Sequence, residues 1–214
     1  MSTYPSIDDI DFADLYRRHM AAVRRPKSAE EWDVRAEAMT LPPADTGYTA
    51  EFVRRMNLSG CDTLLDVGCG LGNIALAVAP KLSQVYGLDY SPRMLARFAQ
   101  HAREQGASGA HAILRSWDDD WHDVPVCDIV VASRSTAVMD MADALRKLHA
   151  KARKRVYLTS VVNGQPGDAS RPAWPDYIYI LNILHAMGIH ARVDYMAGAT
   201  SFSAQWAFIA WDVL

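Results

Sequence analysis

Two short apolar runs with a glycine-rich turn between them constrain the fold of this 214-residue chain more than any other feature. The first run, residues 64–67, includes Asp66, and the second, residues 85–88, is followed by Asp89. Three glycines stand at alternate positions after the first run: Gly68, Gly70 and Gly72. Glycine lets the backbone turn sharply and lets a ligand approach without a Cβ in the way. Two buried strands, a glycine turn and a following acid are typical of the nucleoside-binding half of a doubly wound sheet.

The glycine spacing excludes the two common phosphate-binding motifs. The dinucleotide fingerprint needs its third glycine five places after the first, where this chain has Asn73. A P-loop is excluded because no Gly-Lys-Ser/Thr follows the turn. The carboxylate of Asp66 would repel a pyrophosphate, whereas it would favour a ligand that carries an ammonium group. The expected ligand is therefore a nucleoside with a cationic group.

These two motifs resemble those of the class I S-adenosylmethionine-dependent methyltransferases. Residues 66–72, Asp-Val-Gly-Cys-Gly-Leu-Gly, resemble the first motif of that family. Residues 87–95, Gly-Leu-Asp-Tyr-Ser-Pro-Arg-Met-Leu, resemble the second motif in the form typical of the small-molecule, type 11/25 group. The resemblance is strong over residues 63–162. It implies an α/β, Rossmann-like fold with a seven-stranded, mostly parallel sheet in the order 3-2-1-4-5-7-6, the last strand antiparallel, and helices on both faces.

The resemblance also implies that S-adenosylmethionine is the cofactor and that the glycine turn holds its methionine portion. Asp66 is expected near the ammonium group, directly or through water. Gly68 and Gly70 let the backbone approach the same portion. Cys69 and Asn73 belong to this turn and are predicted to be cofactor-binding residues with it.

The adenosine end of the cofactor is expected against residues that follow the second and third strands. Asp89 should accept hydrogen bonds from both ribose hydroxyls, and Tyr90 should lie against the adenine. After the third strand the family usually has an aspartate that holds the adenine amine. Here Ser116 occupies that place and Asp118 follows two residues later, with Trp117 between them. Either Ser116 or Asp118 could hold the amine.

The acceptor side is less specified by the sequence. Ser133 is expected to touch the methionine moiety, and Arg134 either pairs with an acidic acceptor or points to solvent. The Asn-Pro-Pro-Tyr run of enzymes that methylate adenine N6 or glutamine is absent after the fourth strand, which disfavours both reactions. Tyr48 is expected to reach the cofactor, because an aromatic face beside a sulfonium is favourable. His122 and His185 could approach an acceptor, but no catalytic base is assigned.

The N-terminal segment carries helix signals and no strand signal. Pro26 and the pair at residues 42–43 break it into short helical pieces. We therefore predict a helical lid over residues 1–58 and the cofactor-binding domain over residues 59–214. The acceptor pocket is expected beneath this lid and the loop of residues 163–174.

Two helix boundaries in and after this segment are predicted from local signals. Thr49 is a plausible N-cap for a helix over residues 50–56, because a threonine hydroxyl can accept from a free N–H of the first turn. The first helix of the cofactor-binding domain is predicted over residues 73–79, directly after the glycine turn.

Composition narrows the remaining possibilities. Hydrophobic residues make up 50% of the chain and charged residues 22%, as in soluble globular proteins. The net charge of −3 disfavours a nucleic-acid partner, and no apolar run is long enough to span a membrane. Cys61, Cys69 and Cys127 show neither pairing nor metal spacing. A reduced, cytoplasmic protein with no metal site is predicted, while the oligomeric state stays open.

The predicted reaction is methyl transfer from S-adenosylmethionine to a small-molecule acceptor by in-line displacement. The sulfonium already activates the methyl group, so the protein mainly has to hold two groups in line and exclude water. Two alternatives remain at this point: an RNA- or protein-modifying methyltransferase, and a non-catalytic protein that binds the same cofactor. The sequence does not identify the acceptor or the atom that receives the methyl group.

Overall fold

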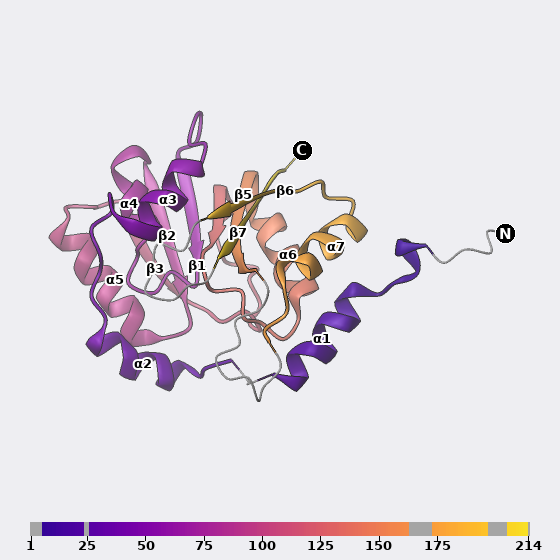
Figure 1. Ribbon diagram of the computed structural model, residues 1–214. Helices are drawn as coiled ribbons and strands as arrows, with labels where there is room; N and C mark the ends of the chain where they lie inside the picture. Colours follow the sequence, from indigo (N-terminus) through magenta and orange to yellow (C-terminus); the bar gives the residue numbers. More distant parts are fainter. Residues whose placement is uncertain (1–5, 24–25, 163–172, 197–204, 214) are drawn as a thin grey trace.

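One mixed sheet runs through the molecule and carries helices on both faces (Figure 1). The computed structural model describes residues 6–23, 26–162, 173–196 and 205–213. Within these residues the strands are β1 (Thr63–Val67), β2 (Gln84–Asp89), β3 (Ala110–Leu114), β4 (Cys127–Ala132), β5 (Ala152–Val161), β6 (Arg192–Met196) and β7 (Trp206–Asp212). Their order is β3-β2-β1-β4-β5-β7-β6. The strands β1 to β5 pair in parallel and β7 is antiparallel to both neighbours, which confirms the predicted topology.

The helices divide between the two faces of the sheet. One face carries α1 (Phe12–Ala22), α6 (Met141–Lys151) and α7 (Tyr177–Ala186), which pack on one another. The other carries α3 (Gly47–Arg55), α4 (Ala75–Val78) and α5 (Pro92–Glu104), and α2 (Ala29–Ala38) packs on the outside of α5. Short 3₁₀ turns occur at η1 (Ile7–Asp9) and η2 (Ala79–Lys81). Figure 1 shows α2 and α1 at the edge of the molecule where the parallel strands end.

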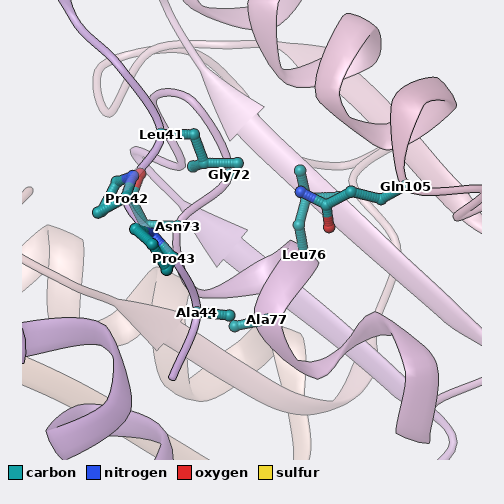
Figure 2. Close-up of a pocket in the computed structure, with 9 residues that line it drawn as sticks. All are labelled: Leu41, Pro42, Pro43, Ala44, Gly72, Asn73, Leu76, Ala77 and Gln105. Atoms are coloured by element: carbon teal, nitrogen blue, oxygen red, sulfur yellow. The ribbon is translucent and has the colours of Figure 1, made fainter. Parts of the chain in front are cut away.

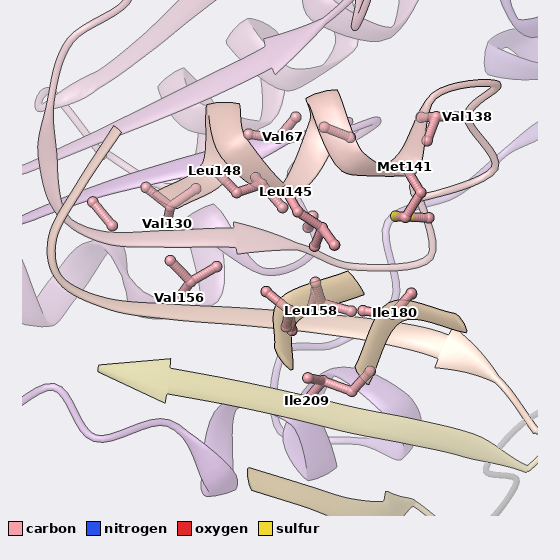
Figure 3. Packing of buried hydrophobic residues seen from close by; sticks show 14 of the residues in the cluster. Val67, Val130, Val138, Met141, Leu145, Leu148, Val156, Leu158, Ile180 and Ile209 are labelled. Atoms are coloured by element: carbon pink, nitrogen blue, oxygen red, sulfur yellow. The ribbon is translucent and has the colours of Figure 1, made fainter. Parts of the chain in front are cut away.

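Strand alternation separates the core into two clusters and determines where the acids lie. Successive residues of a strand point to opposite faces. Leu65 and Val130 therefore lie in one cluster with the apolar side chains of α6. Figure 3 shows Val130 on the same side of the sheet as Leu145 of this helix. Leu64 packs on the opposite face with α3 to α5. Asp66 is in phase with Leu64, so its carboxylate lies on the α4 and α5 face.

The N-terminal helices contribute to both clusters. Tyr16 and Met20 of α1 are buried in the cluster beneath α6, and Phe52 of α3 is fully buried in the opposite one. Ala36 of α2 packs in a third, smaller cluster with residues of the glycine turn and α5. The segment is helical, as predicted, and each helix is anchored by its own buried side chains. The division of the chain at residue 58 stays a prediction.

Both predicted helix boundaries are wrong. Thr46, not Thr49, is the N-cap of α3, and Thr49 is buried within the helix. The helix begins early because burial of Tyr48 favours it, and burial outweighs a capping hydrogen bond. The first helix after the glycine turn is shorter than predicted. Its first N–H, that of Ala75, donates to Asp66 Oδ2, so the turn itself extends to that residue.

A buried carboxylate joins the starts of β1 and β4. Asp128, only 7% exposed, accepts hydrogen bonds from Asp62 N (2.8 Å) and Thr63 N (3.2 Å). The Lys154 ammonium lies 3.2 Å from the same carboxylate. Burial raises the pKa of Asp128, but these donors outweigh it and hold the pKa below its ordinary value.

We expect Asp128→Asn to lower the free energy of unfolding at pH 7 by about 1–3 kcal/mol, because it removes hydrogen bonds to a charged acceptor. A depressed folded-state pKa stabilises the fold above the unfolded-state value of about 4, and this contribution disappears as pH falls through the folded value. Urea unfolding at pH 7 and at pH 3 should therefore show the difference from wild type shrinking in acid. The exposed Asp45→Asn is the control. An equal difference at both pH values would refute the assignment.

Candidate functional site

The glycine turn and the end of β2 form one hydrogen-bonded unit. The N–H groups of Gly68 and Cys69 both donate to Leu88 O, at 2.7 and 3.0 Å. The N–H of Gly70 donates to Asp89 Oδ2 at 2.9 Å. The turn after one strand is thus fixed directly onto the end of its neighbour.

Two glycines of the turn have different surroundings. Gly68 has φ +69°, and a Cβ there would lie 2.3 Å from the Cβ of Ser135, which bonds to Val67 O through its hydroxyl at 2.6 Å. Ser135 therefore closes one side of the turn. Gly70 has φ +53°, and the nearest atom to a Cβ there is Met94 Sδ at 3.9 Å. The turn is open to a ligand at Gly70.

Asp66 is a buried carboxyl, and no cation of the described residues pairs with it. It is 2% exposed, and its Oδ2 accepts from Ala75 N at 3.1 Å. Burial raises the pKa of Asp66 to about 7; the Ala75 N–H opposes this rise and the nearby charge of Asp89 adds to it. A ligand cation placed against Asp66 would favour its ionised form.

The Asp89 carboxylate can accept further hydrogen bonds. Its Oδ1 accepts from Ser91 N and its Oδ2 from Gly70 N, both at 2.9 Å. Burial raises the pKa of Asp89, and these N–H groups oppose the rise. Each carboxylate oxygen has a second lone pair, so Asp89 can accept from two further hydroxyls.

The α2 segment docks on the residues that follow Asp89. Ser91 Oγ donates to Asp33 Oδ1 at 2.5 Å, and Arg93 N donates to the same oxygen at 3.0 Å. The Tyr90 hydroxyl donates to Lys27 O at 2.7 Å. Tyr90 is thus held beside the acid by the N-terminal segment. Trp32 of α2 lies under the Lys27 ammonium, which is 5.2 Å from the centroid of its ring.

The loop after β3 separates the two candidates for the adenine amine. Ser116 Oγ accepts from Asp118 N at 3.2 Å, and Ser116 N donates to Asp119 Oδ2 at 2.7 Å. Trp117 Nε1 donates to Ser135 O at 3.1 Å, which ties this loop to the loop after β4. Asp118 is exposed, and no hydrogen bond to its carboxylate occurs in the part of the chain that the structure describes.

Tyr48 and Ser133 meet at the end of β4. The Tyr48 hydroxyl lies 2.9 Å from Ser133 Oγ and 2.7 Å from Thr159 Oγ1. Tyr48 is 6% exposed, and burial raises the pKa of its hydroxyl. The Arg134 guanidinium lies 4.2 Å above its ring centroid. Sequence reasoning missed Thr159, which is adjacent only because β5 pairs with β4.

An aromatic group that the sequence did not reveal lies where α1 meets α7. The Tyr16 hydroxyl donates to Val138 O at 3.0 Å, and its ring meets that of Tyr179 edge-on at 5.9 Å. His19 Nδ1 lies 3.3 Å from the Tyr179 hydroxyl, and its Nε2 lies 2.8 Å from Ala173 O. Because a carbonyl only accepts, Nε2 of His19 carries a proton.

The two histidines that sequence reasoning considered lie on the surface. His122 is exposed and pairs with Asp120 at 2.9 Å, and His185 is exposed with Nε2 3.9 Å from Asp8. Among the described residues, neither histidine forms a hydrogen bond with Asp66 or Ser133. Of the loop of residues 163–174, expected over the acceptor pocket, residues 163–172 lie outside the described residues.

A hollow of about 350 Å³ lies beside the turn and not among the acids (Figure 2). Its lining residues are Leu41, Pro42, Pro43, Ala44, Gly72, Asn73, Leu76, Ala77 and Gln105. Asn73 thus lines a space with the α2–α3 connection, whereas Asp66, Asp89 and Ser133 do not contribute to it. The sequence prediction placed Asn73 with the other turn residues at the cofactor, and this role stays a prediction.

Other chemistries find little support among the described residues. Within them no helix is long and apolar enough to cross a membrane, and no cluster of three or more His, Cys, Asp and Glu side chains could hold a metal ion. Cys69 is buried, which raises the pKa of its thiol well above the ordinary value. This suits a small packing residue in the turn better than a nucleophile.

We expect Gly68→Ala to lower the free energy of unfolding by about 2–4 kcal/mol, from a left-handed backbone and from overpacking against Ser135. Adding Ser135→Gly should recover part of the loss, because it removes the clashing Cβ. Gly106→Ala is the matched control: Gly106 has φ +68° but no heavy atom within 4 Å of a Cβ. Urea unfolding is measured for the wild type, Gly68→Ala, Ser135→Gly, the double variant and Gly106→Ala. Strict additivity of the Gly68 and Ser135 changes would disprove the close contact.

Comparisons with known proteins agree with this geometry. The family model described as "Methyltransferase domain" matches residues 64–156. An uncharacterized protein of Haemophilus influenzae is 38% identical over 202 residues, which are 89% of this chain and 75% of that protein. The structure of the (4+2)-cyclase SpnF has a TM-score of 0.69 at 17% identity, covering 89% of this chain and 98% of that one.

A third similar structure is magnesium protoporphyrin IX methyltransferase (ChlM) from Synechocystis PCC 6803 with bound S-adenosylhomocysteine. Its TM-score is 0.61 at 17% identity, covering 96% of this chain and 89% of that one. The structural likenesses show the shared fold, and the family match adds the two sequence motifs that the site is built on. This chain belongs to the class I S-adenosylmethionine-dependent methyltransferases.

Proposed function

We propose that this methyltransferase acts on a small-molecule acceptor held at the end of β4. The observation that carries the proposal is the way the N-terminal helices close this edge. Tyr16 of α1 bonds to Val138 O and Tyr48 of α3 bonds to Ser133, so two helices are fixed to one loop. Because these helices are attached near both ends of the loop after β4, they favour a small, enclosed acceptor over a folded macromolecule.

The residues around the turn fit the cofactor of the family. We place the ammonium group of the cofactor at Asp66, because burial disfavours a carboxylate that has no cation beside it. We place the methionine portion of the cofactor against the backbone at Gly70, where the space is open. We place the ribose at Asp89, because both carboxylate oxygens can accept a further hydrogen bond. The bound cofactor supplies a methyl group already activated by a positive sulfur.

The residue that binds the adenine amine is assigned by comparing the hydrogen bonds that Ser116 and Asp118 already accept. Ser116 Oγ already accepts a backbone hydrogen bond, whereas the Asp118 carboxylate accepts none within the described residues. We therefore assign the adenine amine to Asp118. Tyr90 and Trp117 flank this end: Tyr90 is fixed through Lys27 O and Trp117 through Ser135 O. The remaining task of the chain is orientation and exclusion of water.

The RNA alternative would be favoured by a free basic surface near the site. Two lysines at the end of α6 hold neighbouring loops by donating to backbone carbonyls. Lys147 donates to Trp117 O and Asp119 O, and Lys151 donates to Val124 O. These two cations are engaged within the fold, which favours a small acceptor over a nucleic acid.

We expect S-adenosylhomocysteine to bind more weakly as pH falls below about 7, because Asp66 must lose its proton to meet the ammonium group. Calorimetry from pH 6 to pH 8, in two buffers of different ionisation enthalpy, should show proton release on binding. Asp66→Asn should bind weakly with no pH dependence in this range, whereas Asp45→Asn should match wild type. If the affinity of the wild type did not change with pH, the assignment of the ammonium group to Asp66 would be wrong.

The acceptor class is tested by supplying methyl-labelled S-adenosylmethionine with three separated fractions of a bacterial extract: small molecules, RNA and protein. We expect label in the small-molecule fraction. Asp89→Ala should lose the activity, because the loss of two hydrogen bonds to a charged acceptor weakens cofactor binding by roughly 100-fold. Asp89→Asn, which keeps one acceptor oxygen, should retain more. Label in RNA or protein instead would refute the small-molecule acceptor.

A further inference from the structure

The backbone at Arg134 has an unfavourable conformation that its neighbours maintain. Arg134 has φ +56°, and no other non-glycine residue among those described has a positive φ. For an L-residue this conformation costs about 1–2 kcal/mol. The N–H of Arg134 donates to Thr159 Oγ1 at 3.0 Å, and the preceding Ser133 is bonded to Tyr48. A strained residue held by its surroundings at a site edge indicates a function.

The Arg134 side chain rests on a rigid support. Its guanidinium lies 4.2 Å from the centroid of the Tyr48 ring. That ring is buried, and its hydroxyl is fixed by Ser133 and Thr159. A guanidinium placed over an aromatic face keeps its in-plane N–H donors free to bind a planar anion. The arrangement therefore positions the donors before any ligand arrives.

Among the described residues, Arg134 has no anionic partner. No carboxylate of the described residues lies within 4.0 Å of its guanidinium, and none of them accepts a hydrogen bond from it. Arg55 behaves differently, because it pairs with both Glu51 and Asp194. Arg134 is also exposed, so its charge is accessible to a ligand.

The position of Arg134 places it on the acceptor side of the loop. Ser135, the next residue, packs against Gly68 and so faces the cofactor turn. Arg134 is tied instead to Thr159 of β5 and to Tyr48, whose ring meets that of Trp206 on β7. Its guanidinium belongs to the β5 and β7 half of the edge, whereas the turn belongs to the β1 and β2 half.

We propose that Arg134 binds a carboxylate of the acceptor, so that the small molecule methylated by this enzyme is an organic acid. This inference rests on the proposed small-molecule acceptor. A guanidinium and a carboxylate form two parallel charge-assisted hydrogen bonds. One guanidinium neutralises one negative charge, which matches a carboxylate and leaves a doubly charged phosphate with one charge uncompensated. The carboxylate serves recognition and does not determine which atom receives the methyl group.

The inference is tested by separating the small-molecule fraction on an anion exchanger at neutral pH and supplying each half with labelled S-adenosylmethionine. We expect label only from the retained, acidic half. Arg134→Gln should lower this labelling by roughly 10- to 100-fold, the loss expected for charge-assisted hydrogen bonds. Labelling by Arg134→Lys should lie between that of wild type and that of Arg134→Gln, because lysine keeps the charge but lacks the planar guanidinium. Arg103→Gln, at an exposed arginine of α5, should match wild type.

A second measurement distinguishes the acceptor from the cofactor, whose methionine portion also carries a carboxylate. Arg134→Gln should bind S-adenosylhomocysteine as wild type does by calorimetry, which also shows that the variant is folded. A large loss of that affinity would assign the guanidinium to the cofactor and overturn the inference. Label from the unretained half, or equal labelling by wild type and Arg134→Gln, would overturn it while leaving the proposed function intact. Label confined to RNA or protein would refute the proposed function itself.

Discussion

The hydrogen bond from Gly70 N to Asp89 Oδ2 is the interaction on which the candidate site depends. Parallel pairing places Asp66 opposite Gly87, so the turn that follows β1 reaches the end of β2 in register. The turn and the acid then form a single hydrogen-bonded unit. A nucleoside that contacts both is held by groups already fixed relative to each other, which reduces the ordering cost of binding. This unit is rigid because both strands are buried on both faces.

The N-terminal helices complete this unit by docking at different points along the same edge. Through Asp33, α2 is fixed to Ser91 directly after Asp89. Through Tyr48, α3 is fixed to the loop after β4, and α1 reaches the same loop through Tyr16. Each contact joins a helix to a loop that follows a parallel strand. The segment therefore covers the edge at which the parallel strands end, and each anchor is a specific polar contact backed by buried apolar side chains.

The two acids could be singled out because they depend on local patterns: short apolar runs, alternate glycines and an acid in or after each run. The sheet order was predicted only through the resemblance of these motifs to the methyltransferase family, and pairing of the strands confirms it. Thr159 and Ser135 could not be found in this way, since they become neighbours of Tyr48 and Gly68 only through strand pairing and loop packing. The positive φ of Arg134 leaves no mark in the sequence, so its role stayed open there. The start of α3 was mispredicted because burial outweighed a capping signal.

The location of the cofactor is the central claim, and a crystal structure of the protein with S-adenosylhomocysteine tests it most directly. We expect the amino-acid portion of the ligand beside Gly70 with its ammonium at Asp66, and both ribose hydroxyls at Asp89. Density in the hollow beside Asn73 instead, with Asp66 and Asp89 free of ligand, would show that the cofactor binds elsewhere.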